Sequence, residues 1–191
     1  MFRKLFSANL LKGGALLIGA FTIISLLAGP GIAVNPDSFE ITCTPVVTYS
    51  VTISTPASGM EFTSVDVNQT YVSLTSATVT NNGNVTADWK ITGQALDDWM
   101  LGAAPAADTV RLLGMLNSAP AAQGEFSAAD DVIDTEADMD STSYAGDQDG
   151  NNVAPNADRL LWIRLDSPTD TSYDTTQRFR VLIQAYPSSE F

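Results

Sequence analysis

Acidic side chains crowd one stretch of the sequence and are the residues best suited to bind a ligand. Between Arg111 and Arg159 there is no lysine or arginine. The acids between positions 125 and 149 are Glu125, Asp130, Asp131, Asp134, Glu136, Asp138, Asp140, Asp147 and Asp149. Asp147 and Asp149 stand two residues apart just before Gly150, and calcium loops use this spacing to fold around the ion. We therefore take Asp147 and Asp149 as candidate calcium ligands.

A competing interpretation of this stretch is a solvated acidic loop at about 118–158. The match to an EF-hand is poor. If Asp147 and Asp149 took its third and fifth positions, Ala145 would be first and Asn156 twelfth, where the motif places Asp and Glu. Calcium is the one cofactor that the sequence suggests, and the solvated loop is the alternative to it.

Other familiar catalytic constellations are missing from the sequence. There is no histidine, which excludes Ser-His-Asp and Cys-His nucleophilic sites and histidine-ligated metals. Cys43 is the single cysteine, so neither an intrachain disulfide nor a thiolate zinc site can form. Walker and Rossmann glycine motifs are also absent. A pair of carboxylates for glycoside hydrolysis stays open, but we expect no enzyme.

The charge distribution predicts an exported, acidic domain. The first 12 residues carry three bases and no acid, and Ala15 to Ala28 is an apolar run of 14 residues, too short to span a bilayer comfortably. Gly31 and Ala33 then suit a cleavage site, so residues 1–33 are predicted to be a signal peptide; a retained membrane anchor is the alternative. Beyond residue 33 lie all 22 acids and six of the nine bases, a net charge of −16. Such a surface repels nucleic acid and anionic lipid, so we expect neither as a partner.

Alternating β-branched and polar residues predict a single antiparallel β-sandwich over residues 34–191. About eight strands are expected, since apolar-polar alternation is typical of strands with one covered face. The expected strands cover 39–54 (one strand, or two broken at Pro45), 62–67, 71–80 with a break near 75–76, 87–96, 99–101, 110–116, 159–166 and 178–185. A short helical turn is the most that 128–139 suggests. The predicted core contains Val51, Ile53, Trp89, Ile91, Ile163, Leu165, Val181 and Ile183.

Two further positions depend on this pattern. Cys43 shares the parity of Val51 and is expected to be a buried thiol, with an intermolecular disulfide as the alternative. Trp162 lies on the strand face opposite the core and is expected to be covered by the acidic loop; exposure to a partner is the alternative.

The segment around Asn82-Gly83 is the strongest local turn signal. A two-residue hairpin there would put Val79 on the same face as Asp88 and Lys90, which would waste its burial. Keeping Val79 and Trp89 on one side needs either a three-residue loop, 82–84, or strands that lie in different sheets and face the same core.

The stretch Val79-Thr80-Asn81-Asn82-Gly83-Asn84-Val85-Thr86 resembles the V-x-N-x-G-N-x-T turn of exported bacterial immunoglobulin-like β-sandwich surface proteins. The resemblance implies an immunoglobulin-like or jelly-roll-like sandwich and a structural or adhesive role at the cell surface or outside the cell. A subunit of a fibre or surface array, with itself or other envelope components as partner, is the form we expect. No membrane contact is expected after signal cleavage. The alternative is a soluble module that binds calcium or a glycan.

Overall fold

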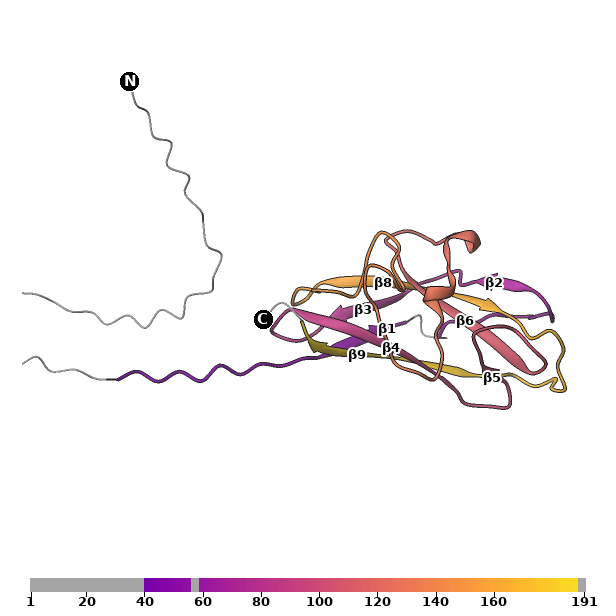
Figure 1. The fold of residues 1–191 in the computed structure, drawn as a ribbon, viewed down its shortest axis with the longest axis horizontal. Coiled ribbons are helices and arrows are strands. Elements are labelled where there is room, and N and C mark those ends of the chain that lie inside the picture. Colours follow the sequence, from indigo (N-terminus) through magenta and orange to yellow (C-terminus); the bar gives the residue numbers. More distant parts are fainter. Residues whose placement is uncertain (1–39, 56–58, 189–191) are drawn as a thin grey trace, which may run out of the picture. The chain divides into compact units, whose positions relative to one another are not determined.

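The computed structural model describes residues 40–55 and 59–188 (Figure 1). The chain divides into two units, Met1–Cys43 and Thr44–Phe191, and the strands of the described residues lie in the second. In the first unit only residues 40–43 are described, and the predicted signal peptide lies outside the described residues. Within residues 40–55 and 59–188, no helix is long and apolar enough to cross a membrane.

The fold is all-β, as predicted. Its strands are β1 (Val51–Ser54), β2 (Thr70–Val72), β3 (Ala77–Asn81), β4 (Ala87–Ala95), β5 (Met100–Leu101), β6 (Thr109–Leu116), β7 (Ala137–Asp138), β8 (Asp158–Asp166) and β9 (Phe179–Pro187). Two short 3-10 helices, η1 (Gln123–Glu125) and η2 (Ala128–Asp130), lie between β6 and β7. The helical turn expected within 128–139 corresponds to η2.

Two sheets form a sandwich-like fold. The larger sheet has the order β1-β3-β8-β6-β5, with β2 also paired to β8, and the smaller has the order β7-β4-β9. Every pair is antiparallel except β5 with β6. The predicted break at 75–76 separates β2 from β3, whereas 62–67 forms no strand even though Phe62 and Val65 pack against the core.

The turn at Asn82-Gly83 connects the two sheets, because β3 belongs to the larger and β4 to the smaller. Val79 and Trp89 are both buried in the space between them, so the different-sheet alternative is confirmed. The buried side chain of Asn81 holds the crossover: its Nδ2 donates to the carbonyl oxygens of Val85 (3.0 Å) and Val153 (2.7 Å), and its Oδ1 accepts from Gly83 N (3.0 Å). A buried amide must have such partners, and here they fix the path of the chain.

Most of the predicted core is correct. Trp89, Ile91, Ile163, Leu165 and Ile183 are buried, and Val51 and Val181 are half-buried against the same cluster.

Two core assignments near the N-terminus are wrong. The Ile53 side chain is 37% exposed, because β1 is a four-residue edge strand. Cys43, expected to be buried, is exposed. The long strand expected at 39–54 is reduced to β1, since residues 40–50 form no strand (Phe39 lies outside the described residues).

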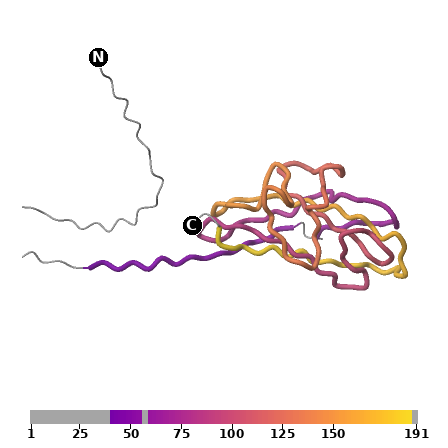
Figure 2. Tube along the Cα trace, in the orientation of Figure 1, coloured from indigo at the N-terminus to yellow at the C-terminus, as the bar shows by residue number. Residues whose placement is uncertain are grey.

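The chain between β6 and β8 gathers on one side of the sandwich, in the salmon to orange part of the tube (Figure 2). Its Ala121 and Phe126 pack on the outer face of the larger sheet, against Leu113, Met115 and Trp162. Trp162 is only 5% exposed, and its indole Nε1 donates to Asn117 O (2.9 Å). The prediction that the acidic segment covers Trp162 is confirmed.

Candidate functional site

The two predicted calcium ligands lie in one loop, but each carboxylate has a hydrogen-bonding role of its own. Asp147 accepts from the Ser118 hydroxyl and from Ser118 N (2.6 Å), and these bonds, the hydroxyl bond most, hold its pKa below the usual range. Asp149 Oδ1 accepts from Asn151 N (3.2 Å), and its carbonyl oxygen accepts from Arg159 Nε (2.9 Å). Asp147 therefore fastens the end of β6 to the loop, while Asp149 shapes a turn. Calcium binding at this pair stays a prediction.

Close approach of the backbone, and not the geometry of a calcium loop, explains why position 150 is glycine. Its carbonyl oxygen accepts from Trp89 N (2.8 Å), and its N–H donates to Met139 O (2.7 Å). A Cβ atom at this position would come within 2.7 Å of the Met139 Cβ. Glycine is therefore required because three backbone segments approach closely.

Other acids of the segment also act on the backbone. Asp130 is 3% exposed and accepts from Ser127 N (2.6 Å) and Tyr144 N (2.7 Å). Asp140 accepts from the Thr142 hydroxyl, Thr142 N and Ser143 N, and these bonds lower its pKa, the hydroxyl bond most.

Asp131 pairs with Arg111 of β6 in a two-pronged ion pair, and the side-chain hydrogen bond raises the arginine's pKa. Hydrogen bonds and ion pairs of this kind hold the acidic segment to the sandwich.

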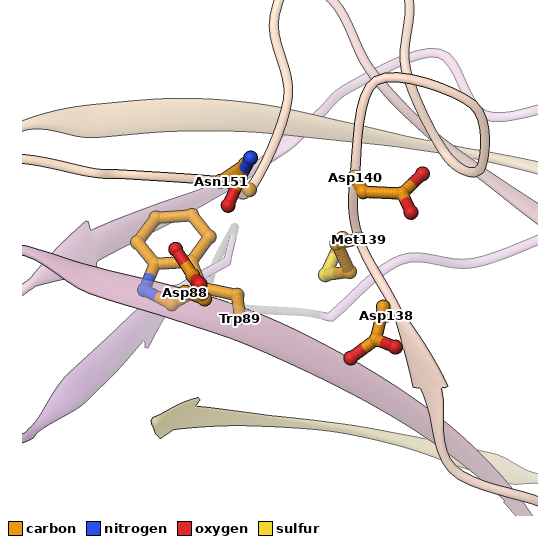
Figure 3. A pocket seen from close by; sticks show the side chains of 7 residues that line it. Asp88, Trp89, Asp138, Met139, Asp140 and Asn151 are labelled. Atoms are coloured by element: carbon orange, nitrogen blue, oxygen red, sulfur yellow. The ribbon is translucent and has the colours of Figure 1, made fainter. Parts of the chain in front are cut away.

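A pocket of about 290 Å³ lies where this segment meets β4. Its polar lining comes from Asp88 on β4, Asp138 on β7, and Asp140 and Asn151 in the loops (Figure 3). In Figure 3, Asp88 and Asn151 lie on one side and Asp138 and Asp140 on the other, with Met139 between them. The three carboxylates give the hollow a negatively charged lining, which repels anions.

The carboxylates of the pocket also have protein partners. Asp88 Oδ1 accepts from Asn152 N (2.7 Å). Lys90 Nζ lies 3.4 Å from both Asp138 Oδ1 and Glu136 Oε1, and the hydrogen bond to Glu136, followed by Asp138, raises the lysine's pKa. In the described part of the chain, no three His, Cys, Asp or Glu residues form a group arranged to hold a metal ion.

The sequence analysis did not find this pocket. Asp138 and Asp140 belong to the acidic stretch that the sequence marks, but Asp88 is marked there only as a polar residue on the face that Val79 avoids. The pocket exists because Trp89 N, Gly150 and Met139 hydrogen-bond across β4 and the loop. No local motif encodes that long-range contact.

A second candidate site is the edge of the smaller sheet. β9 is its last strand, nine residues long, and within the described residues it pairs with β4 alone. Phe179, Val181 and Ala185 face the core from β9 and are only half-buried. β1 ends the larger sheet close to β9 (Figure 1), and among the described residues no backbone hydrogen bond joins them.

We call this region the β1–β9 seam. A strand edge with free N–H and C=O groups is a template for pairing with another strand. Charges pointing inward commonly protect such edges, but the inward residues of β9 are apolar; Arg180 is the one charged residue of β9 and points outward. Neither the pocket nor the seam can be assigned by kinship, because no protein-family model matches the chain and no curated protein sequence matches it.

Proposed function

We propose that this protein is a non-enzymatic, exported structural or adhesive subunit that associates with copies of itself or with other envelope components through a sheet edge. The observation that carries the proposal is β9: a nine-residue, apolar edge strand whose outer side has no strand partner among the described residues. Such edges are rare in proteins that must stay monomeric, because they invite pairing with another chain.

The chemistry of the acidic segment supports the same proposal. Asp130, Asp140 and Asp147 accept hydrogen bonds from nearby backbone N–H groups, and Asp131 pairs with Arg111. Carboxylates used in this way order loops and do not poise a group for proton transfer. The signal peptide predicted at 1–33 and the resemblance to immunoglobulin-like surface proteins support a location at the cell surface or outside the cell, and an immunoglobulin-like or jelly-roll-like topology belongs to this proposal.

The test is to isolate native cell-surface and secreted material and examine it by negative-stain electron microscopy, with antibody labelling for this chain. Labelled fibres or ordered arrays are expected. Sedimentation of the purified protein over a range of concentrations should show association. A protein that remains monomeric at every concentration and labels no assembly would refute the proposal.

A second candidate function is a binding module for calcium, and the pocket of Asp88, Asp138 and Asp140 favours it. The pocket suits a glycan less well than calcium, because Trp89 and Met139 are almost fully buried and offer no exposed ring or apolar surface for a sugar. Oxygen-rich sites in extracellular proteins bind calcium at about 10⁻⁴–10⁻³ M.

Thermal unfolding with EDTA and with millimolar calcium tests this candidate. Calcium at about 1 mM is roughly one to ten times such a Kd and would stabilise the fold by about 0.4–1.4 kcal/mol. Asp138→Asn/Asp140→Asn should remove the shift if the pocket is the site, and Asp147→Asn/Asp149→Asn should remove it if the loop predicted from the sequence is. An unmoved midpoint in the unsubstituted protein would exclude both.

A further inference from the structure

The geometry points to a definite partner for the free edge of β9: residues 40–48 of a second copy of this chain, which we name the arm. The inference rests on the proposed function, because it names the contact through which copies associate. Pairing would be by addition of a strand, with backbone hydrogen bonds between the arm of one copy and β9 of the next.

The arm has the properties of a strand without a sheet. All residues from 40 to 48 are exposed, and Ile41 (72%) and Val46 (77%) are among the most exposed large apolar side chains of the described chain. Ile41 and Cys43 alternate with Thr42 and Thr44, and Val47 keeps the parity of Ile41, whereas Val46 has the opposite one. Period-two alternation of this kind is typical of a strand with one covered face. No other described segment of the same copy covers that face, and its exposure costs free energy that pairing would recover.

The arm and the edge match in character. β9 is nine residues long, so its edge can accommodate residues 40–48 as an added strand. The inward side chains of β9 that remain half-buried are Phe179, Val181 and Ala185. A strand added beyond β9, with its apolar parity turned inward, would extend the smaller sheet and cover these side chains. Residues directly opposite on paired strands face the same way, so the two apolar rows would become continuous.

Charge also favours this contact over others between two copies. The whole chain has a net charge of −13, so most surfaces of two copies repel each other. The arm carries one acid, Glu40, and β9 carries one base, Arg180, while Arg178 just before β9 is already paired with Asp97. The contact therefore joins a nearly neutral segment to an edge that holds one of the chain's few bases.

The arm's attachment favours a second copy over its own β9. Residues 46–48 are fixed beside the crossover, since Asn84 Nδ2 donates to Val46 O (2.8 Å) and Asn84 N to Thr48 O (3.2 Å). That is the end of the sandwich at which Ala87 pairs with Pro187, the last residue of β9. Backbone groups of Val46 and Thr48 are thus already bonded at that end of the chain's own sandwich, and pairing with the β9 of a second copy leaves these bonds in place.

Disulfide trapping tests the contact, because Cys43 is the chain's only cysteine. Full-length protein with Cys43, recovered after export, is mixed with a differently tagged Cys43→Ser chain carrying Val181→Cys or Ala185→Cys. Matched controls carry Leu182→Cys or Gln184→Cys, which lie on the same strand but point outward. The separation of paired strands permits a disulfide only between side chains on one face. We expect a linked heterodimer with at least one inward cysteine, several-fold above the outward controls.

Several outcomes would overturn the inference. These are equal yields at inward and outward positions, preferential linkage to Ile53→Cys on β1, or a predominantly intrachain link when Cys43 and Val181→Cys are in one chain. Peptide mapping by mass spectrometry identifies each link.

Association measured by sedimentation then separates this inference from the proposed function. Ile41→Asp/Val47→Asp should raise the concentration needed for association at least about tenfold, which corresponds to about 1.4 kcal/mol. Thr42→Asp/Thr44→Asp adds the same charge to the opposite parity and should have a much smaller effect. If the unsubstituted protein associates and Ile41→Asp/Val47→Asp associates equally well, the inference fails and the proposed function stands. If the unsubstituted protein never associates, both fail.

Discussion

Two regions of this molecule exchange the roles that their compositions predict. The acidic segment between β6 and β8 has the composition of a solvated loop, yet it buries Phe126 and the Asp130 carboxylate and covers Trp162. The segment from residue 40 to β1 has the composition of a core strand, yet Ile41 and Ile53 are exposed. The difference teaches that satisfied hydrogen bonds can order a polar segment, whereas an apolar pattern alone does not secure a place in the core.

The physical cause of the difference is the availability of partners. The acidic segment lies across the outer face of the larger sheet, where backbone N–H groups, Arg111 and apolar side chains all meet it. Burial of a polar group costs little free energy when all of its hydrogen bonds are made within the protein. The N-terminal segment has β3 on one side of β1 and, among the described residues, no strand on the other. If the proposed association through β9 is correct, the missing partner comes from another copy.

Among substitutions that test this comparison, we expect the largest loss of stability at Phe126. Phe126→Ala should lower the free energy of unfolding by about 3 kcal/mol, because it opens a cavity between the acidic segment and Leu113. Urea unfolding followed by circular dichroism measures the change. Leu74→Ala is the matched control, since Leu74 is almost fully exposed and its removal should cost under about 0.5 kcal/mol. Equal effects would mean that the segment does not contribute to the core.

A somewhat smaller loss is expected at Asp130. Asp130→Ala leaves the N–H groups of Ser127 and Tyr144 without their acceptor, which should cost about 2 kcal/mol in urea unfolding. Asp134→Ala removes the same charge from an exposed position in the same segment and should change stability by no more than about 0.5 kcal/mol. If both variants behave alike, then charge repulsion and not hydrogen bonding governs the segment.

Local patterning was sufficient for most strands, because their alternation reports which face is covered. It also reduced the possible conformations of the Asn82-Gly83 turn correctly, since the parity of Val79 and Trp89 excluded a two-residue hairpin. The crossover between sheets depends on Asn81 bonding to Val153, 72 residues away, which no local pattern contains. The same limit applies to the pocket at Gly150 and to Ile53, whose exposure follows from its strand lying at an edge.

The Tyr144 hydroxyl tests the acidic segment in a third way. We expect it to contribute about 1 kcal/mol to the free energy of unfolding at neutral pH and to lose this contribution at alkaline pH. The buried Tyr144 hydroxyl donates to the carbonyl oxygen of Asp131, and burial, with the charges of Asp131 and Asp130, raises its pKa to about 12. An exposed tyrosine in the unfolded chain titrates near pH 10. The raised pKa means that its contribution is complete below pH 10 and is lost as the pH rises through about 12.

Tyr144→Phe should lose about 1 kcal/mol at pH 7 and show a shallower decline in stability between pH 10 and 12 than the unsubstituted protein. Tyr173→Phe, at an exposed position, is the control and should keep the full decline. An unchanged alkaline decline in Tyr144→Phe would show that other groups cause it.

The smallest effect is expected at the β1–β9 seam, and it sharpens the comparison most. Ile53→Ala should cost less than about 1 kcal/mol in dilute protein, because the side chain keeps more than a third of its surface in water. Ile183→Ala, a matched control in β9 with a buried side chain, should cost about 2–5 kcal/mol. At concentrations where copies associate, strand addition at the seam would cover more of the surface near β1, and the cost of Ile53→Ala should then increase. A large loss of stability for Ile53→Ala in dilute protein would mean that β1 is part of the closed core of a single copy. It would then count against the seam as a docking edge.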